Sequence, residues 1–208
     1  MMTDPIANLQ PMTLASASPA RKRMLEGAGV RVDVVPARVD EAAIRDALDV
    51  EAGNWQPGDV AELLARAKVD DVITRTSSRY VIAADQILAF EGEFYGKPRD
   101  LGSARDQLLS LRGKTHELHT AAVLSDNGEV VWVHVDVAYV TLRDFTPVFL
   151  GRYLAQAGQK ITQSVGCYEL EGVGVQLIDR IEGDYFTVLG LPLYAILAEL
   201  RRRDVLLS

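Results

Sequence analysis

The sequence predicts an α/β protein in which helices flank a mixed β-sheet. Three observations favour this fold class. Apolar runs of strand length alternate along the chain with stretches whose apolar residues recur at helical spacing. Two long strands in the middle are separated by Asp126-Asn127-Gly128, a turn typical of an antiparallel hairpin, so the sheet is not all parallel. The 208 residues fit one large domain or two lobes and can bury a core without disulfides or metals.

The first elements are a strand, a helix, a strand and a second helix. A short apolar run over 14–18 predicts the first strand, and helical spacing then leads to Gly29, a residue that commonly ends a helix. Alternation over 30–35 predicts the next strand. Glycine and proline over 51–58 predict a loop, after which Asp59 can cap a helix with an apolar stripe.

The middle of the chain holds the longest predicted strands. A near-continuous apolar run over 81–90 predicts a buried strand, and the turn Glu91-Gly92 leads into a second short one. Ser103 can cap the helix that follows. The hairpin turn then joins strands over 118–125 and 129–142.

The last third returns to helices and short strands. Thr146-Pro147 is a typical helix start, because proline is well tolerated at the first helical position. Apolar runs around 167–170 and 175–179 predict two more strands. Pro192 begins a last helix, which ends in the basic run Arg201 to Arg203.

Composition narrows the function classes. Apolar residues make up 48% and charged residues 25%, which is ordinary for a folded protein and excludes wholesale disorder. The net charge is 22 − 29 = −7, so we expect no nucleic-acid partner. The single cysteine, Cys167, excludes an intramolecular disulfide and suits a reducing cytoplasm. The first residues do not resemble a signal peptide, and no apolar stretch reaches the ~18 residues of a spanning helix, so we expect no membrane partner.

Several familiar motifs are incomplete. Gly113-Lys114-Thr115 resembles the end of a phosphate-binding loop, but the earlier glycine is replaced by Leu108. Gly172-Val173-Gly174 lacks the third glycine of a dinucleotide fingerprint. His116 and His119 are three apart at the start of a predicted strand, a spacing that points them to opposite faces rather than to one metal. We expect these histidines, and Cys167, to be structural or surface residues.

Asp85 is the strongest candidate for chemistry. It interrupts the apolar run Val81 to Ala89, and an ionised carboxylate in a buried strand is costly unless it is paired or binds a metal. A functional role is favoured, with a structural ion pair as the alternative.

A turn of small residues provides a candidate anion site. Ser16-Ala17-Ser18-Pro19 precedes a helix, and hydroxyls with backbone N–H groups at a helix start favour an anion. Arg21 and its basic neighbours add positive charge, although an ordinary capped helix with a solvated basic turn has the same pattern. With Glu41, Lys68, Asp85 and Lys97, the set suits a metal-bound polyphosphate, in which Mg²⁺ bridges carboxylates and phosphate oxygens.

The ordered motifs together resemble the Maf family of septum-formation-inhibitor-like nucleotide pyrophosphatases. The resemblance runs from Leu14 to about Leu200. Its motifs occur in the family's order: Leu14 to Pro19, Asp40-Glu41, Lys68, Ala84-Asp85, Gly96-Lys97-Pro98, Gly113 to His116, Gly166-Cys167-Tyr168, Glu171 to Gly174, Ile181-Glu182-Gly183 and Gly190 to Leu193.

The resemblance implies a fold, a reaction and a site. The fold is an elongated mixed sheet with two lobes around a central cleft, like that of inosine triphosphate pyrophosphatases. Residues 13–208 would form this single domain, preceded by a tail over 1–12. The enzyme would be cytoplasmic, often dimeric, and would hydrolyse a nucleoside triphosphate to the monophosphate and pyrophosphate with a divalent cation, Mg²⁺ or Mn²⁺.

The residue roles also follow from the resemblance. Asp85 would be the proton acceptor or a metal-side carboxylate, and Glu41 a second metal ligand. Lys68 and Lys97 would complete the catalytic and phosphate site. The phosphate turn would be formed by Ser16, Ser18 and Arg21.

Three positions bear on the choice of base. Gln86 and Glu171 resemble the branch that hydrolyses 7-methylguanosine triphosphate, whereas pyrimidine-preferring members usually have Thr and Gln there. Ala20 stands where that branch usually has Trp. Two of three positions therefore favour a guanine-type nucleotide.

Two other functions stay open at the level of sequence. One is a non-catalytic regulator of cell division that binds a nucleotide or a protein, and the other is a phosphatase acting on the γ-phosphate. The main reading is a pyrophosphatase that clears non-standard or surplus nucleotides, because a pure binding module has no need of Asp85, Lys68 and Lys97 together.

Overall fold

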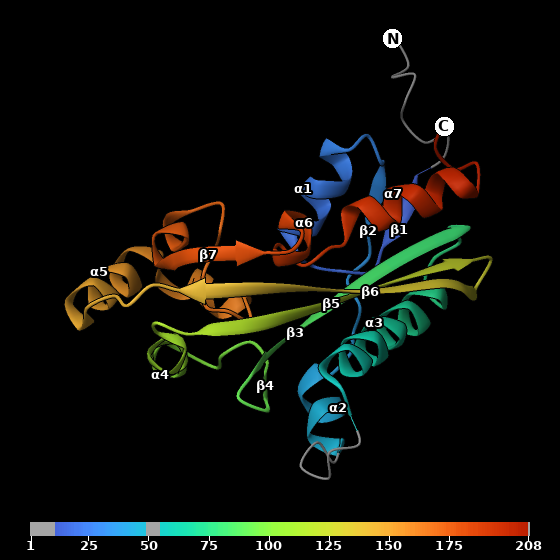
Figure 1. Ribbon diagram of the computed structural model, residues 1–208. Coiled ribbons are helices and arrows are strands. Elements are labelled where there is room, and N and C mark those ends of the chain that lie inside the picture. Colours follow the sequence, from blue (N-terminus) through green and yellow to red (C-terminus); the bar gives the residue numbers. More distant parts are fainter. Residues whose placement is uncertain (1–10, 49–54, 208) are drawn as a thin grey trace. The chain divides into compact units, whose positions relative to one another are not determined.

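The computed structural model of the chain describes residues 11–48 and 55–207, and it has the expected mixed α/β class (Figure 1). Within those ranges, seven strands form one sheet in the order β2-β1-β3-β5-β6-β7, and β4 pairs with β3. β1 is parallel to both β2 and β3, whereas β4 and β7 are antiparallel to β3 and β6. The strands are β1 (Met12–Leu14), β2 (Val32–Val34), β3 (Tyr80–Phe90), β4 (Glu93–Tyr95), β5 (Thr115–Asp126), β6 (Glu129–Leu142) and β7 (Ile178–Glu182).

Most helices begin close to the predicted positions, whereas the two short helices that begin at Glu41 and Tyr185 were not predicted. The helices are α1 (Pro19–Gly27), α2 (Glu41–Ala47), α3 (Pro57–Ile73), α4 (Leu101–Leu111), α5 (Pro147–Ala157), α6 (Tyr185–Val188) and α7 (Leu193–Arg202), with 3₁₀ turns η1 (Gly158–Gln163) and η2 (Val173–Leu177). None of them, over the two described ranges, is long and apolar enough to cross a membrane.

The chain divides into two compact units. The first unit comprises 1–86, 120–136 and 185–208, and the second comprises 87–119 and 137–184. Most of the expected tail over 1–12 lies outside the described residues, although Met12 already opens β1.

Alternation along β3 places neighbouring residues of the first unit on opposite faces of the sheet. Ile82 and Ala84 belong to the apolar core that β1 and β3 form with α1 and α7. Asp85 therefore faces the other side, where α3 lies (Figure 1). Gln86 returns to the side of α1 and α7.

The second unit has its own buried contacts. Tyr153 on α5 donates a 2.9 Å hydrogen bond to the carbonyl of Cys167, and the amide of Gln107 on α4 donates to the carbonyl of Val165 at 2.5 Å. The ring of His116 on β5 is 2.8 Å from the hydroxyl of Tyr168. These contacts hold the irregular segment before η2 against one strand and two helices.

Two helix starts differ from the prediction. Asp59 is not the N-cap of α3, because the helix begins at Pro57 and the Asp59 carboxylate accepts the N–H of Gln56 at 3.2 Å. Likewise Ser103 lies inside α4, and its N–H donates to Asp100, the real cap, at 2.7 Å. In both cases an earlier residue with a suitable side chain begins the helix.

Three strand predictions were wrong in extent or kind. The first strand ends at Leu14 rather than continuing to Ser18, because Ser16 already bonds within the turn. The run over 167–170 is not a strand, since Cys167 has φ of 57° and its carbonyl bonds to a tyrosine. Most of 175–179 is 3₁₀ turn, and β7 starts only at Ile178.

Candidate active site

The turn after β1 brings two serines and an arginine together. The N–H of Ala15 still bonds to Ile82 of β3 at 2.8 Å, and the chain then leaves the sheet. Ser16 is buried, and its Oγ accepts the N–H of Ser18 at 3.2 Å. Ser18 caps α1 by accepting the N–H of Arg21 at 3.4 Å. Ser18 is therefore an ordinary helix cap, and binding of an anion by the same turn stays a prediction.

Arg21 is held by two acceptors from distant parts of the first unit. Its Nη1 donates to Ser16 Oγ at 3.2 Å, and its Nε donates to the carbonyl of Gly190 at 2.7 Å. Burial lowers the pKa of Arg21 from its ordinary value, while the charges of Asp85 and Glu41 act in the opposite direction. The guanidinium is thus within electrostatic reach of both carboxylates.

Lys68 stands between the two carboxylates. It lies on the buried face of α3, where its neighbours are apolar, and its side chain is 7% exposed. Its Nζ is 2.7 Å from Glu41 Oε1 and also donates to Asp85 Oδ1. Asp85, itself 5% exposed, therefore has the ion pair that the sequence left as an alternative. A structural pair needs one partner, however, and here two carboxylates share one ammonium group.

Glu41 reaches this site because of a helix cap. Asp40 accepts the N–H of Ala43 at 3.0 Å and starts α2, which places Glu41 in the first turn. Asp40 thereby has a structural role, and Glu41 supplies the carboxylate to the site.

The donor set fits a hard divalent cation that is shared with a substrate. Glu41 and Asp85 offer carboxylate oxygens, the ligands that Mg²⁺ prefers, and both converge on Lys68. Within the described ranges no group of three or more acidic, histidine or cysteine side chains could hold a metal alone. Mg²⁺ is commonly bound by one or two carboxylates together with substrate phosphates and water, and two carboxylates suffice for that.

Gln86 is oriented by three acceptors. Its Nε2 donates to Thr120 Oγ1 and to the carbonyl of Thr187, each at 2.9 Å, and to the carbonyl of Val188 at 3.4 Å. The side-chain oxygen lies near Gly190, where an added Cβ would be 3.8 Å from Oε1 and 3.4 Å from Arg21 Nη2. Gly190 also has φ of 93°, a value that side chains disfavour.

Arg21 lies near both Asp85 and Gln86, but among the described residues it is bonded only on the side of Gln86. It is within electrostatic reach of Asp85 on the α3 side, and it bonds to Gly190 beside Gln86 on the other side. Sequence reasoning missed this role of Gly190, and also Thr120 and Thr187. For Gly190 the sequence offers one signal, a glycine directly before Leu191-Pro192. For the two threonines the sequence offers no signal of their role.

The remaining predicted residues are placed as follows. Ala20 is half-buried on α1 of the first unit. Lys97 and Glu171 belong to the second unit, where both are exposed. That Lys97 and Glu171 share a site with Asp85 stays a prediction.

The residues expected to be structural or on the surface are buried or paired with a neighbouring side chain. Burial lowers the pKa of His116 to about 4, and His119 pairs with Glu117 at 2.6 Å. Cys167 is fully buried, and burial raises its pKa to about 12, which makes it a poor nucleophile. Lys114 pairs with Glu91 at 2.9 Å on the surface.

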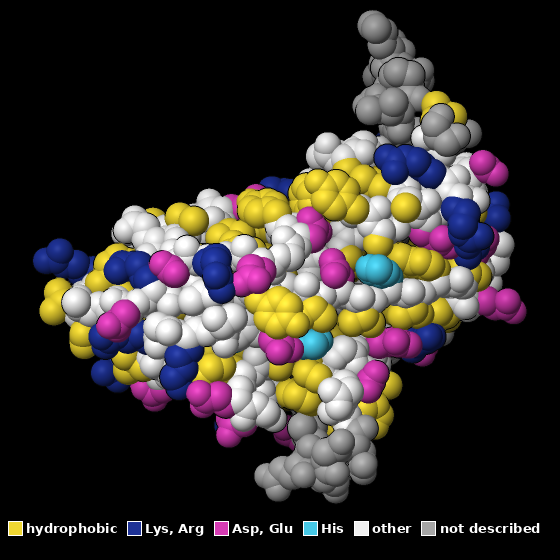
Figure 2. All heavy atoms as spheres, in the orientation of Figure 1, with side chains coloured by type: hydrophobic (Ala, Val, Ile, Leu, Met, Phe, Trp, Pro, Cys, Tyr) yellow, Lys and Arg dark blue, Asp and Glu magenta, His cyan; other side chains and the backbone are white. Residues whose placement is uncertain are grey.

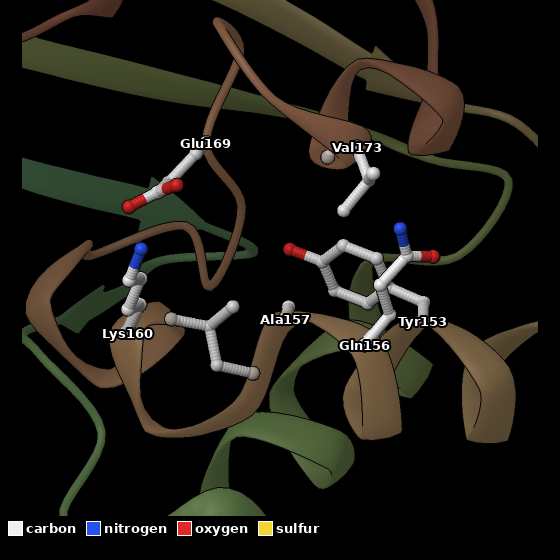
Figure 3. Close-up of a pocket in the computed structure, with 8 residues that line it drawn as sticks. Tyr153, Gln156, Ala157, Lys160, Glu169 and Val173 are labelled. Atoms are coloured by element: carbon white, nitrogen blue, oxygen red, sulfur yellow. The ribbon is translucent and has the colours of Figure 1, made fainter.

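The second unit also carries a small surface pocket of about 230 Å³ (Figure 3). Tyr153 forms its floor between α5 and the segment before η2, and Lys160 and Glu169 point toward each other at its edge. Lys160 and Glu169 are exposed, so the pocket presents solvated charges rather than buried ones.

Comparison with known proteins agrees with the motifs. The model of the Maf family, described as "Maf-like protein", matches residues 11–203. The chain belongs to this family.

Curated relatives extend over most of the chain. A 7-methyl-GTP pyrophosphatase from Mesorhizobium japonicum is 49% identical, covering 90% of this chain and 94% of its own length. Another protein of that name from Brucella abortus is 44% identical over 92% and 95%. A nucleoside triphosphate pyrophosphatase from Paramagnetospirillum magneticum is 47% identical over 93% and 98%. Among solved structures, a nucleoside-triphosphatase / dITP/XTP pyrophosphatase from Mycobacterium abscessus aligns at 17% identity with a TM-score of 0.41, over 94% and 97%.

Proposed function

We propose that this chain hydrolyses a guanine-type nucleoside triphosphate, such as 7-methylguanosine triphosphate, to the monophosphate and pyrophosphate. The wider class is given by the family and its relatives: the chain is a nucleotide pyrophosphatase, an enzyme that acts on an acid anhydride. The observation that carries the hydrolytic part of the proposal is the buried Lys68 between Asp85 and Glu41, with Arg21 within electrostatic reach of both carboxylates.

Lys97 and the turn after β1 would bind the triphosphate. Ser16 and Ser18 would offer hydroxyls and backbone N–H groups, and Arg21 would supply a fixed positive charge. Lys97, which lies between Gly96 and Pro98, would add a second positive charge to the phosphates.

Asp85 would act as the proton acceptor. A water molecule attacks the α-phosphorus, and the bond from this phosphorus to the leaving pyrophosphate oxygen breaks. Asp85 takes a proton from the attacking water. Lys68 holds the carboxylate in place by a hydrogen bond, and burial of both groups strengthens that interaction. Because Lys68 also contacts Glu41, a movement of either carboxylate would shift Lys68 and so change its interaction with the other carboxylate.

A divalent cation, Mg²⁺ or Mn²⁺, would be held by Glu41 and Asp85 together with the substrate. Bound there, it would neutralise charge on the polyphosphate and favour departure of pyrophosphate. This role would complement Arg21, which carries a charge that does not depend on the metal.

Base choice would rest on Glu171, Gln86 and Ala20. Guanine presents N1–H and an amino group as adjacent donors, which an ionised Glu171 could accept together. Small Ala20 leaves space where an indole would stack on a cationic methylated base, so affinity for such a base would be reduced. The names of relatives include both the 7-methyl-GTP and the general nucleoside triphosphate activity.

Product analysis over a panel of nucleotides tests the proposal. Pyrophosphate and monophosphate are expected from a guanine-type triphosphate. Orthophosphate with a diphosphate would instead identify a γ-phosphatase. No turnover of any nucleotide would restore the non-catalytic regulator of cell division, a function that no contact described above favours.

Assembly and location are also proposals. We expect a homodimer in the cytoplasm that clears non-standard or surplus nucleotides, without a nucleic-acid partner. On the face drawn in Figure 2, Lys and Arg side chains are interspersed with Asp and Glu, and the net charge is −7, which supports the last point. Light scattering after gel filtration would measure the assembly, and a monomer at all concentrations would exclude the dimer.

A further inference from the structure

The side-chain amide of Gln86 is part of a chain of hydrogen bonds with a defined direction. Thr187 Oγ1 donates to Asp136 Oδ2 at 2.7 Å, and Thr120 Oγ1 donates to the carbonyl of Thr187 at 3.1 Å. Since the Thr120 proton is used in this way, its oxygen can only accept from Gln86. Gln86 therefore meets the network with its N–H₂ group.

The opposite orientation of the amide is unfavourable. Turned over, Gln86 would direct its carbonyl oxygen at the carbonyls of Thr187 and Val188, which now lie 2.9 and 3.4 Å from Nε2. Oxygens that are both acceptors repel, and the carbonyls would lose donors in a region where Thr120 and Thr187 are fully buried. The network thus selects one of two amide orientations.

The half-buried outer end of Gln86 is consequently an acceptor. All hydrogen bonds that this side chain makes to described residues come from Nε2. Its Oε1 lies beside Gly190, which has no side chain to cover it, on the side where Arg21 is anchored. An acceptor placed there suits a ligand that offers an N–H donor.

We propose that Thr120 is a positioning residue that fixes Gln86 as a hydrogen-bond acceptor and so selects nucleotides whose base presents an N–H-rich edge, as guanine does. This inference rests on the proposed function, since it assumes that Gln86 faces the base. Uracil and thymine present one N–H between two carbonyls, and these carbonyls are repelled by an outward-facing oxygen. Thr120 acts only through Gln86.

The test measures selectivity in two ways. One is the ratio of kcat/KM for GTP to that for UTP, and the other is the ratio of dissociation constants for their α,β-methylene analogues, which are not hydrolysed to pyrophosphate. Thr120→Val removes the hydroxyl without changing the shape much. We expect both ratios to fall about fivefold to tenfold toward UTP, the effect of weakening one or two hydrogen bonds. Thr120→Ser restores the hydroxyl and should restore both ratios.

Two controls separate positioning from stability. Ser125→Ala removes another fully buried hydroxyl of β5, one that bonds to the carbonyl of Val81 at 3.4 Å, and should leave the ratios unchanged. In a Gln86→Met background, Thr120→Val should have no further effect on either ratio, because the amide through which it acts is absent.

The outcomes distinguish the inference from the proposed function. The inference is overturned if Thr120→Val lowers kcat/KM for GTP and UTP equally. It is also overturned if Thr120→Val still changes selectivity in the Gln86→Met background. A wild-type protein that binds the analogues without hydrolysing nucleotides overturns the proposed function, while the affinity ratios still decide the role of Thr120. Absence of binding to both analogues overturns both.

Discussion

Lys68 on α3 donates a hydrogen bond to Asp85 on β3, and both side chains are almost completely buried. Burial of a lone charge is costly, so each group depends on the other. The same ammonium contacts Glu41, which comes from a different helix, at 2.7 Å. One lysine therefore holds in place two carboxylates that the sequence separates by more than forty residues.

Asp85→Asn is expected to lower turnover by two or more orders of magnitude and to leave the fold intact. Asparagine has nearly the same shape and keeps an oxygen that can accept from Lys68, but it cannot take a proton from water. General-base roles are worth roughly 10²- to 10⁴-fold. Turnover of the purified variant measures the effect, and circular dichroism checks the fold. Asp70→Asn, an exposed change on α3, is the matched control. Near-normal turnover of Asp85→Asn would exclude the catalytic assignment.

Three lysine-to-alanine variants should differ in a defined order. Lys68→Ala and Lys97→Ala should each lose more activity than Lys114→Ala, because Lys114 pairs with Glu91 on the surface. Lys68→Ala should also be less stable by about 3 kcal/mol, since it leaves buried Asp85 without its cation. Lys97 is exposed, so its removal should lower stability much less than the removal of Lys68. Urea unfolding and steady-state kinetics measure both quantities. Equal losses of activity at all three positions would indicate a diffuse basic surface.

Removal of divalent cations should abolish activity, and Mg²⁺ or Mn²⁺ should restore it. Two carboxylates near a polyphosphate leave a charge that Lys68 and Arg21 only partly offset, so a cation is expected with the substrate. Turnover is measured in excess chelator and again after each metal is added. Glu41→Gln should raise the metal concentration needed for half-maximal activity. Undiminished turnover in excess chelator would remove the metal from the mechanism.

Stability should fall as the pH falls from about 6.5 to 4 because of His116. Burial lowers its pKa from 6.5 to about 4, so the unfolded chain binds a proton over this interval that the folded protein does not. The contribution of neutral His116 is fully present above pH 6.5, is lost through the window, and amounts to roughly 3 kcal/mol. Urea unfolding at several pH values across this range should show the free energy of unfolding falling as the pH falls.

A pair of histidine variants tests that origin. His116→Gln cannot be protonated and should flatten the pH dependence between 6.5 and 4, whatever its own stability. His134→Gln changes a half-buried histidine that stacks on Trp132 and should keep the slope. An unchanged slope in His116→Gln would assign the pH dependence to other groups.

Local sequence signals predicted most elements of the fold and the main carboxylate of the site. Proline at the start of α5 and the Asn127-Gly128 turn have local physical causes, and the structure confirms them, whereas Pro19 was placed in the turn before α1 and instead begins that helix. Asp85 was conspicuous because one charged residue interrupted an apolar strand. Predictions failed where a distant group decided the backbone, as for Cys167, whose carbonyl bonds to Tyr153 instead of a neighbouring strand.

Contacts between distant residues were beyond the reach of sequence patterns. The bond between Arg21 and Gly190 joins residues 169 positions apart, and that between Gln86 and Val188 joins residues 102 apart. Nothing in a local window indicates which carbonyl an arginine or an amide will meet. The sequence likewise does not indicate that the donor of Gln86 is used internally, by Thr120 and the carbonyl of Thr187.

Base choice should depend on Glu171. The wild-type enzyme should prefer 7-methylguanosine triphosphate or another guanine-type nucleotide to dTTP and UTP, because guanine offers two adjacent donors to the carboxylate of Glu171. Glu171→Gln replaces one acceptor oxygen by a donor and should shift relative kcat/KM toward pyrimidine nucleotides. Glu169→Gln, at the nearby exposed position that lines the pocket of the second unit, is the control and should keep the preference. A wild-type preference for dTTP over every guanine nucleotide would exclude this reading of Glu171 and leave the pyrophosphatase class untouched, since that class rests on the family and on its relatives rather than on the base-reading position.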